Sequence, residues 1–314
     1  MFQYIADFLT YSLLGLVEGE QFAQSVHFFV YDVFKILFLI FFVVSFIAFL
    51  RTFFAPGKIK RAMAKMRFGS GNLLAACFGA VTPFCSCSSI PLFIGFLKAR
   101  VPAGVAFSFL VTSPLVNEVA FVIMGGLFGW KLAVLYAISG ILLGVFAGLL
   151  LGAFNLEKNL ILEEKGKMIS QDTSFKGFKS RIRYAFQDGR QIFKKIYLYI
   201  IAGVAVGAAI HGYVPDEFFV NYVGKYELLS VPLAVILGVP IYAGCSTVAP
   251  VIFSITQNGV PLGTSMAFMM SIAGLSLPEA VMLKRVLSLK LLAIFFGIVA
   301  AGIVAIGYLF NIIS

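Results

Sequence analysis

The chain has 314 residues, of which 61% are hydrophobic and only 12% charged, and its formal net charge is +10. Soluble domains contain about 25% charged residues, so this composition excludes an ordinary soluble domain and predicts an integral membrane protein. The basic residues lie between apolar runs, where they predict cytoplasmic loops facing anionic lipid rather than a nucleic-acid-binding surface.

Residues 1–32 contain acidic residues but no Lys or Arg, and we expect them on the extracytoplasmic side of the membrane. Within them, residues 1–17 are apolar but short for a membrane span and are interrupted by Asp7, a pattern typical of an interfacial helix. Because no basic residue precedes the apolar stretch, this segment does not match a secretory signal.

Apolar runs then alternate with short polar segments, and they cover residues 33–54, 71–97, 102–128, 130–154, 191–214, 231–256, 261–282 and 287–313. The stretch 155–190 is polar and mostly basic, and we interpret it as a cytoplasmic linker. This linker divides the chain into two predicted transmembrane regions, 33–154 and 191–314.

The second region repeats the first at an offset of 159 residues. The matched positions include the pairs Gly79 and Gly238, Pro91 and Pro250, Pro102 and Pro261, Gly104 and Gly263. Chance similarity between Leu-rich and Gly-rich helices would not keep the proline pairs in register. A constant offset over the whole half therefore predicts an internal repeat.

The positions of the basic residues determine the expected topology. The clusters 51–67, 98–100, 158–195 and 284–285 should all be cytoplasmic, which requires residues 71–97 to enter and leave on one side as a re-entrant hairpin. Each repeat then has three spanning helices and one proline-broken hairpin, and the odd number of crossings inverts the second repeat. We therefore predict an all-α integral membrane protein with two inverted-topology repeats, the plan of many secondary transporters.

The first hairpin contains a polar motif, running from Thr82 to Pro91, inside the otherwise apolar run 71–97. Proline breaks a helix, and broken backbone at membrane depth survives only where protein covers it or where it lines a wet cavity. The candidate substrate-binding residues of this motif are Cys85, Ser86, Cys87, Ser88 and Ser89. The alternative is a proline-kinked helix whose hydroxyls bond to their own carbonyls.

The second hairpin supplies Cys245, Ser246 and Thr247 as further substrate-binding candidates. The offset of 159 places Cys245 on Ser86, between two cysteines of the first motif. Broken segments in corresponding places of two inverted repeats usually mark the substrate site of a transporter. We therefore expect the two hairpin tips to meet near the middle of the membrane.

Three cysteines would then face one cavity. Cys85, Cys87 and Cys245 are possible metalloid ligands, because thiols prefer soft, thiophilic species to hard cations. A closed four-cysteine zinc site is not expected, since Cys77 lies eight residues before Cys85, and we expect Cys77 to pack as an apolar residue. A buried, inert role stays open for the other three as well, because thiols in apolar surroundings remain protonated.

A second broken segment occurs in each repeat, at residues 112–118 and 271–279. In the first repeat it provides two more substrate-binding candidates, Ser113 and Asn117, together with Glu118. A carboxylate within a membrane segment is costly and usually functional, which makes Glu118 a candidate for proton coupling. Glu279 is its counterpart, two residues out of register and expected close to the cytoplasmic interface. In the alternative, these acids are held neutral or capped by neighbouring polar groups.

These motifs resemble those of the ArsP-like family of predicted permeases, which includes organoarsenical efflux permeases. The resemblance rests on residues 82–91, 112–118 and 244–247 and covers nearly the whole chain. It implies a multi-pass permease in the cytoplasmic membrane of a prokaryote. It also implies efflux of trivalent organoarsenicals or a similar small soft metalloid, and hence arsenic resistance.

The leading hypothesis is a proton-coupled secondary exporter and not an enzyme. Its expected partners are the lipid bilayer and a small soft metalloid or thiol-reactive solute, with no nucleic acid, cofactor or resident metal; a homo-oligomer is compatible with this plan. One alternative is the transport of another small solute, with structural cysteines. The other is a membrane thiol or redox protein that uses Cys85 and Cys87.

Overall fold

A computed structural model of the chain describes residues 2–17, 19–51, 69–82, 86–98, 101–116, 118–153, 178–213, 229–241, 245–257, 259–284 and 286–313. The helices of the first half are α1 (Phe2–Asp7), the π-helix η1 (Phe8–Leu13), α2 (Gln21–Arg51), α4 (Ser70–Val81), α5 (Ser86–Lys98), α6 (Ala103–Leu115), α7 (Glu118–Phe128) and α8 (Trp130–Ala153). Those of the second half are α9 (Phe178–Tyr213), α11 (Ser230–Gly238), α12 (Cys245–Gln257), α13 (Leu262–Gly274), α14 (Leu277–Leu283) and α15 (Leu289–Ile313). The fold is all-helical, as expected.

The offset found in the sequence also relates the helices of the two halves. Adding 159 to both ends of α5 gives both ends of α12, and the same holds for α6 and α13. Helices α8 and α15 begin at equivalent residues, Trp130 and Leu289. The two halves of the chain therefore contain the same series of helices.

Glycines bring the corresponding helices of each half equally close together. Gly104 on α6 faces α8 so closely that a Cβ atom there would lie 2.6 Å from the carbonyl oxygen of Gly148. In the second half, a Cβ atom on Gly263 of α13 would overlap the carbonyl oxygen of Gly307 on α15. Small residues at these positions allow backbone contact between helices, which drives helix association where lipid removes the hydrophobic effect.

Helices that correspond to each other across the repeat are also packed together: α2 with α9, α6 with α13 and α8 with α15. At two of these contacts the touching residues are themselves equivalent. Gly274 of α13 lies against Leu115 of α6, and Gly302 of α15 lies against Leu143 of α8. Equivalent residues contact each other where a two-fold axis passes between them. These contacts are consistent with the internal repeat predicted from the sequence.

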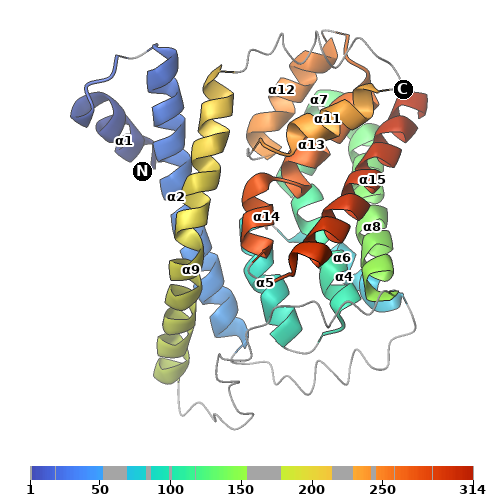
Figure 1. Cartoon of the computed structure of the whole chain (residues 1–314), viewed down its shortest axis with the longest axis horizontal. Helices are drawn as coiled ribbons and strands as arrows, with labels where there is room; N and C mark the ends of the chain where they lie inside the picture. The colour runs from blue at the N-terminus through green and yellow to red at the C-terminus, as the bar shows by residue number, and fades with distance from the viewer. Residues whose placement is uncertain are drawn as a thin grey trace.

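The paired helices α2 and α9 run antiparallel along one side of the molecule (Figure 1). Their ring contacts show this direction, since Phe49 near the end of α2 lies 5.6 Å from Phe178 at the start of α9. Earlier in α2, Phe41 lies 5.7 Å from Phe193, which is later in α9. The order of these ring contacts along the two helices shows that α2 and α9 are antiparallel.

Helix α2 begins at Gln21, twelve residues before the span predicted from residue 33, so part of the expected surface segment is helical. Its Phe34, Phe38, Phe42 and Phe46 recur at helical spacing and are all exposed. Helix α9 likewise begins at Phe178, inside the predicted linker. An exposed row of phenylalanines on a long helix is suited to contact with lipid.

Besides the pieces of the two broken spans, each described half contains two helices that are too short to cross a bilayer. Helices α4, α5, α11 and α12 contain 12, 13, 9 and 13 residues. At 1.5 Å per residue they reach about 14–20 Å, less than the roughly 30 Å of a hydrocarbon core. Helices α4 and α5 lie toward the lower end of the molecule in Figure 1, and α11 and α12 lie toward the upper end.

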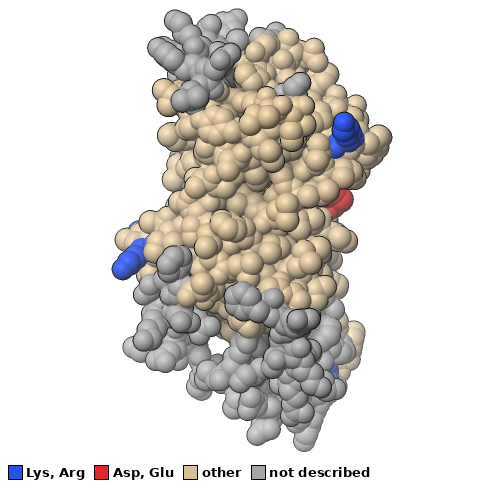
Figure 2. Space-filling view, turned by 90° about the vertical axis from the view of Figure 1, so that its right-hand side faces the viewer, with Lys and Arg blue, Asp and Glu red and all other residues tan. Residues whose placement is uncertain are grey.

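Among the described residues, three helical stretches are long and apolar enough to span a membrane: Trp130–Ala153, Leu262–Leu283 and Leu289–Ile313. Helices α6 and α7 form a fourth if the two are counted as one span bent by 45°. Figure 2 shows that the face on the α8 and α15 side is almost free of charged side chains over its described part. These features are those of a membrane protein.

The glycine contacts predict opposite effects on stability for two glycine-to-alanine substitutions. Gly104→Ala is expected to destabilise the protein by about 1–3 kcal/mol, because the added methyl group overlaps backbone of the neighbouring helix. Gly297→Ala is the matched control on α15, where a Cβ atom would meet nothing within 4 Å. It should leave stability unchanged or raise it by about 0.5–1 kcal/mol through helix propensity. Thermal unfolding in detergent measures both, and equal effects of the two variants would contradict the packing.

Candidate functional site

The cysteine motifs lie at the starts of two equivalent helices. Helix α5 begins at Ser86 and helix α12 begins at Cys245, as the sequence offset places them. Cys85 and Asn117 lie outside the described residues, as do the side chains of Ser86, Cys87, Ser88, Cys245, Ser246 and Thr247. Convergence of the three thiols therefore remains a prediction.

Two of the predicted site residues do come together. The hydroxyl oxygens of Ser89 on α5 and Ser113 on α6 are hydrogen-bonded at 2.8 Å, and both side chains are fully buried. Aromatic packing holds the same two helices together, with the Phe93 and Phe107 rings 5.0 Å apart and the Phe96 and Phe109 rings 5.2 Å apart. Helix α5, which begins in the first cysteine motif, is thus fixed to α6, the first helix of the broken span.

Helices α5 and α12 each also contact the broken span of the other half. Helix α12 of the second half packs against α7 of the first, and α5 of the first half packs against α14 of the second. The helix that begins at Ser86 is therefore in contact with the helix that carries Glu279. The helix that begins at Cys245 is in contact with the helix that carries Glu118. These two contacts join helices α5, α7, α12 and α14, which begin within the four segments that the sequence predicts to be broken.

The first broken span changes direction at Val116, whose backbone is extended (φ −124°, ψ 107°). The bend frees carbonyl groups that would otherwise bond within a helix, and hydrocarbon cannot solvate them. The buried Tyr136 of α8 donates its hydroxyl proton to the carbonyl oxygen of Leu115 at 2.8 Å. Tyr136 thus stabilises the break, a role with no signal in the sequence because it depends on a neighbouring helix.

The two carboxylates occupy opposite environments. Glu118 is exposed at the start of α7, whereas Glu279 in α14 is fully buried. The burial of Glu279 follows from the packing of α14 against α5 and α9, and its expected place close to the cytoplasmic interface stays a prediction. Both carboxyl oxygens of Glu279 lack a hydrogen-bond partner in the described structure.

The prediction that Cys77 packs inside the protein as an apolar residue is wrong. Its side chain is exposed on α4, as are those of Leu73, Leu74 and Phe78. No group of three His, Cys, Asp or Glu side chains in the described part of the chain is arranged to hold a metal ion.

The comparison with protein families decides what kind of membrane protein this is. The ArsP_1 family, described as "Predicted permease", matches residues 21–312, which include both halves and both cysteine motifs. The chain belongs to this permease family. Its helical fold, its apolar spans and its family thus agree on a membrane permease.

The permease is similar to several known proteins over most of their length. It is 22% identical to UPF0718 protein MJ0584 of Methanocaldococcus jannaschii, over 76% of this chain and 81% of that protein. It is 24% identical to UPF0718 protein YraQ of Escherichia coli, over 79% and 69% of the two chains. It is 26% identical to UPF0718 protein YcgR of Bacillus subtilis, over 70% and 74%. No solved structure matches the chain.

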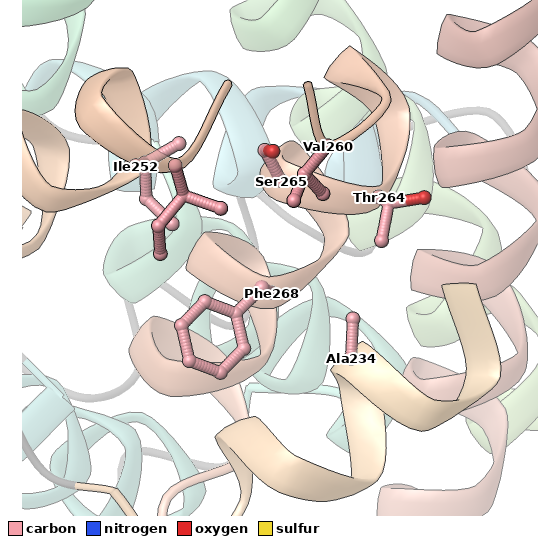
Figure 3. Close-up of a pocket in the computed structure, with 7 residues that line it drawn as sticks. Ala234, Ile252, Val260, Thr264, Ser265 and Phe268 are labelled. Carbon is pink, nitrogen blue, oxygen red and sulfur yellow. The ribbon is translucent and has the colours of Figure 1, made fainter. Parts of the chain in front are cut away.

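A small pocket of the permease lies among α11, α12 and α13, where Ala234, Ile252, Ile255, Val260, Thr264, Ser265 and Phe268 line it (Figure 3). The equivalents of Ile252 and Ile255 in the first half are Phe93 and Phe96, whose rings pack against Phe107 and Phe109. The pocket is therefore explained by smaller side chains at two repeated positions. It is apolar and is not lined by the cysteine motifs.

The bond between Ser89 and Ser113 generates the second prediction. Ser89→Ala, Ser113→Ala and the double variant should give a coupling free energy of about 0.6 kcal/mol, the usual size for an interhelical hydrogen bond in a membrane protein. Reversible unfolding in mixed micelles measures it. Ser139→Ala is the control, because that hydroxyl bonds to Tyr136 within its own helix. Strictly additive effects of the two serine changes would contradict the bond.

Proposed function

We propose that this permease is a secondary transporter built from two inverted repeats and that it exports a small, soft, thiol-reactive solute. The observation that carries the proposal is the packing of each helix in the pairs α2 and α9, α6 and α13, and α8 and α15 against its own equivalent. Antiparallel α2 and α9 are what an axis lying in the plane of the membrane requires. Such repeats are typical of secondary transporters.

The re-entrant plan is supported by helix length. Each half contains a pair of helices too short to cross, α4 with α5 and α11 with α12, and the two pairs lie toward opposite ends of the molecule (Figure 1). Each pair is joined by a proline-containing or glycine-containing motif, 82–85 and 239–244. In an inverted repeat these pairs enter the membrane from opposite sides.

The proposed substrate follows from the residues at the starts of α5 and α12. Cys85, Cys87 and Cys245 lie at or beside the two equivalent helix starts, with Ser86, Ser88, Ser246 and Thr247 next to them. Thiols select soft species, and a trivalent methylated arsenical offers two exchangeable positions for them. We therefore place a trivalent organoarsenical first among the substrates, with Ser89, Ser113 and Asn117 beside its path.

Proton coupling is proposed for the two carboxylates. Glu118 is exposed and Glu279 is buried in this conformation, and each begins or follows a helix break in its own half. A carboxylate at such a depth is expensive unless it exchanges a proton or contacts a cation. Alternating exposure of such groups is how a secondary transporter couples a gradient to its cycle.

Resistance to trivalent methylarsenic tests the thiol site. In cells without their own arsenic export, Cys85→Ser with Cys87→Ser should lower the tolerated concentration to that of cells lacking the permease, because the soft ligands are gone. Cys77→Ser is the matched control, since that thiol is exposed on α4 and lies outside the 82–91 motif. Undiminished resistance in the double variant would leave transport of another solute, with structural cysteines, as the better explanation.

The inverted plan has its own test. In a background without native cysteines, Lys98→Cys and Gln257→Cys place single thiols at equivalent positions, at the ends of α5 and α12. A membrane-impermeant maleimide added to whole cells should label position 257 but not position 98, because the basic cluster 98–100 is cytoplasmic. Labelling of both from the same side would rule out the inversion.

A further inference from the structure

The second broken span holds an unusual group of buried oxygen atoms. Helix α13 ends at Gly274 and α14 begins at Leu277, and Ser276 between them is extended (φ −66°, ψ 147°). The backbone N–H of Leu277 donates to the carbonyl oxygen of Val239 at 3.0 Å, which holds the break against the end of α11. The break is therefore a fixed part of the fold.

Three side-chain oxygens at this break have no partner. Ser276 is 1% exposed and Glu279 is 0% exposed, and neither the Ser276 hydroxyl nor either carboxyl oxygen of Glu279 makes a hydrogen bond in the described structure. The sequence Ser-x-x-Glu is typical of a capping box, in which both side chains bond to backbone N–H groups. Here Ser276 makes no such cap, so local capping does not explain the pair.

No charged neighbour compensates Glu279 within the described residues. Helices α11 and α13 contain no titratable residue. Helix α14 packs against α9 and α5, and Glu279 forms no ion pair with a described side chain of either. On α5 the side chains of Cys87 and Lys98 lie outside the described residues. The described titratable residues of α9 are Lys179, Arg181, Arg183, Tyr184, Arg190, Lys194 and Tyr197.

The first half shows that packing alone does not require a carboxylate at this place. The offset of 159 puts Glu279 on Ala120, which is also fully buried, and puts Ser276 on Asn117. An alanine satisfies the same position in the same series of helices. A buried, uncompensated carboxylate costs several kcal/mol, so its presence in one half only points to a ligand.

We propose that Glu279 and Ser276 bind the small monovalent cation that is coupled to transport, either a proton or a sodium ion. The inference rests on the proposed secondary transport and deepens it. Carboxylate and hydroxyl oxygens are the hard ligands that such cations prefer. The cation would balance the charge that the fold leaves unpaired.

Cation binding is tested on the purified full-length protein without any transported solute, by thermal unfolding in NaCl and in KCl at equal ionic strength and across pH 5–8. A sodium site should raise the unfolding temperature in NaCl by about 5 °C near a hundred times the dissociation constant. A proton site should give no difference between the salts and a rise as the pH falls, because protonation removes the unpaired charge. Glu279→Gln should abolish whichever response occurs, and Ser276→Ala should weaken a sodium response several-fold.

The matched control is Glu20→Gln, which removes an exposed carboxylate outside both broken spans and should respond as the wild type does. Identical responses of wild type and Glu279→Gln to both cations would overturn the proposal. If Glu279→Gln does not fold, a wild type that is indifferent to sodium and pH overturns it equally. Because no solute is present, this result is independent of the arsenical resistance that tests the proposed function.

Discussion

Backbone groups that leave a helix inside a membrane must find partners within the protein, and the rest of this structure depends on that constraint. The chain breaks its helices at Val116 and again at residues 275–276. At the first break Tyr136 bonds the freed carbonyl of Leu115, and at the second Val239 accepts from the N–H of Leu277. The breaks are tolerated because neighbouring parts of the protein cover them and hydrogen-bond their free backbone groups.

The same constraint explains why the two halves exchange contacts. Helix α12 covers α7 and α5 covers α14, so each half protects the break of the other. Tyr136 and Val239 satisfy backbone groups at the break of their own half, and the helix from the other half adds packing around it. The close glycine contacts at Gly104 and Gly263 then let the remaining helices pack without a hydrophobic driving force.

The two carboxylates lie in different environments, Glu118 exposed and Glu279 buried. Under the proposed inverted repeat, this difference would correspond to a conformation open on one side only. The soft thiols and the hard oxygens also lie on different elements, the starts of α5 and α12 and the α13–α14 break. A transporter needs both kinds of site, one for the carried solute and one for the ion that supplies the free energy.

Several features could be predicted because they are properties of neighbouring residues. Prolines and polar residues marked the broken segment 112–118, and the offset of 159 gave the start of α12 from that of α5. The burial of Glu279, the exposure of Cys77 and the bond from Tyr136 could not be predicted in this way. Each of these depends on which helix face meets another helix.

The sequence by itself therefore determined that this is an all-helical membrane protein and where its 112–118 segment breaks, and it predicted that the two halves repeat. Only the tertiary structure decided which side chains meet at the breaks and which face outward. The reason is the solvent: in a bilayer, the face of a helix toward lipid is as apolar as the face toward protein. Hydrophobic periodicity, which orients a helix in water, carries little information about orientation here.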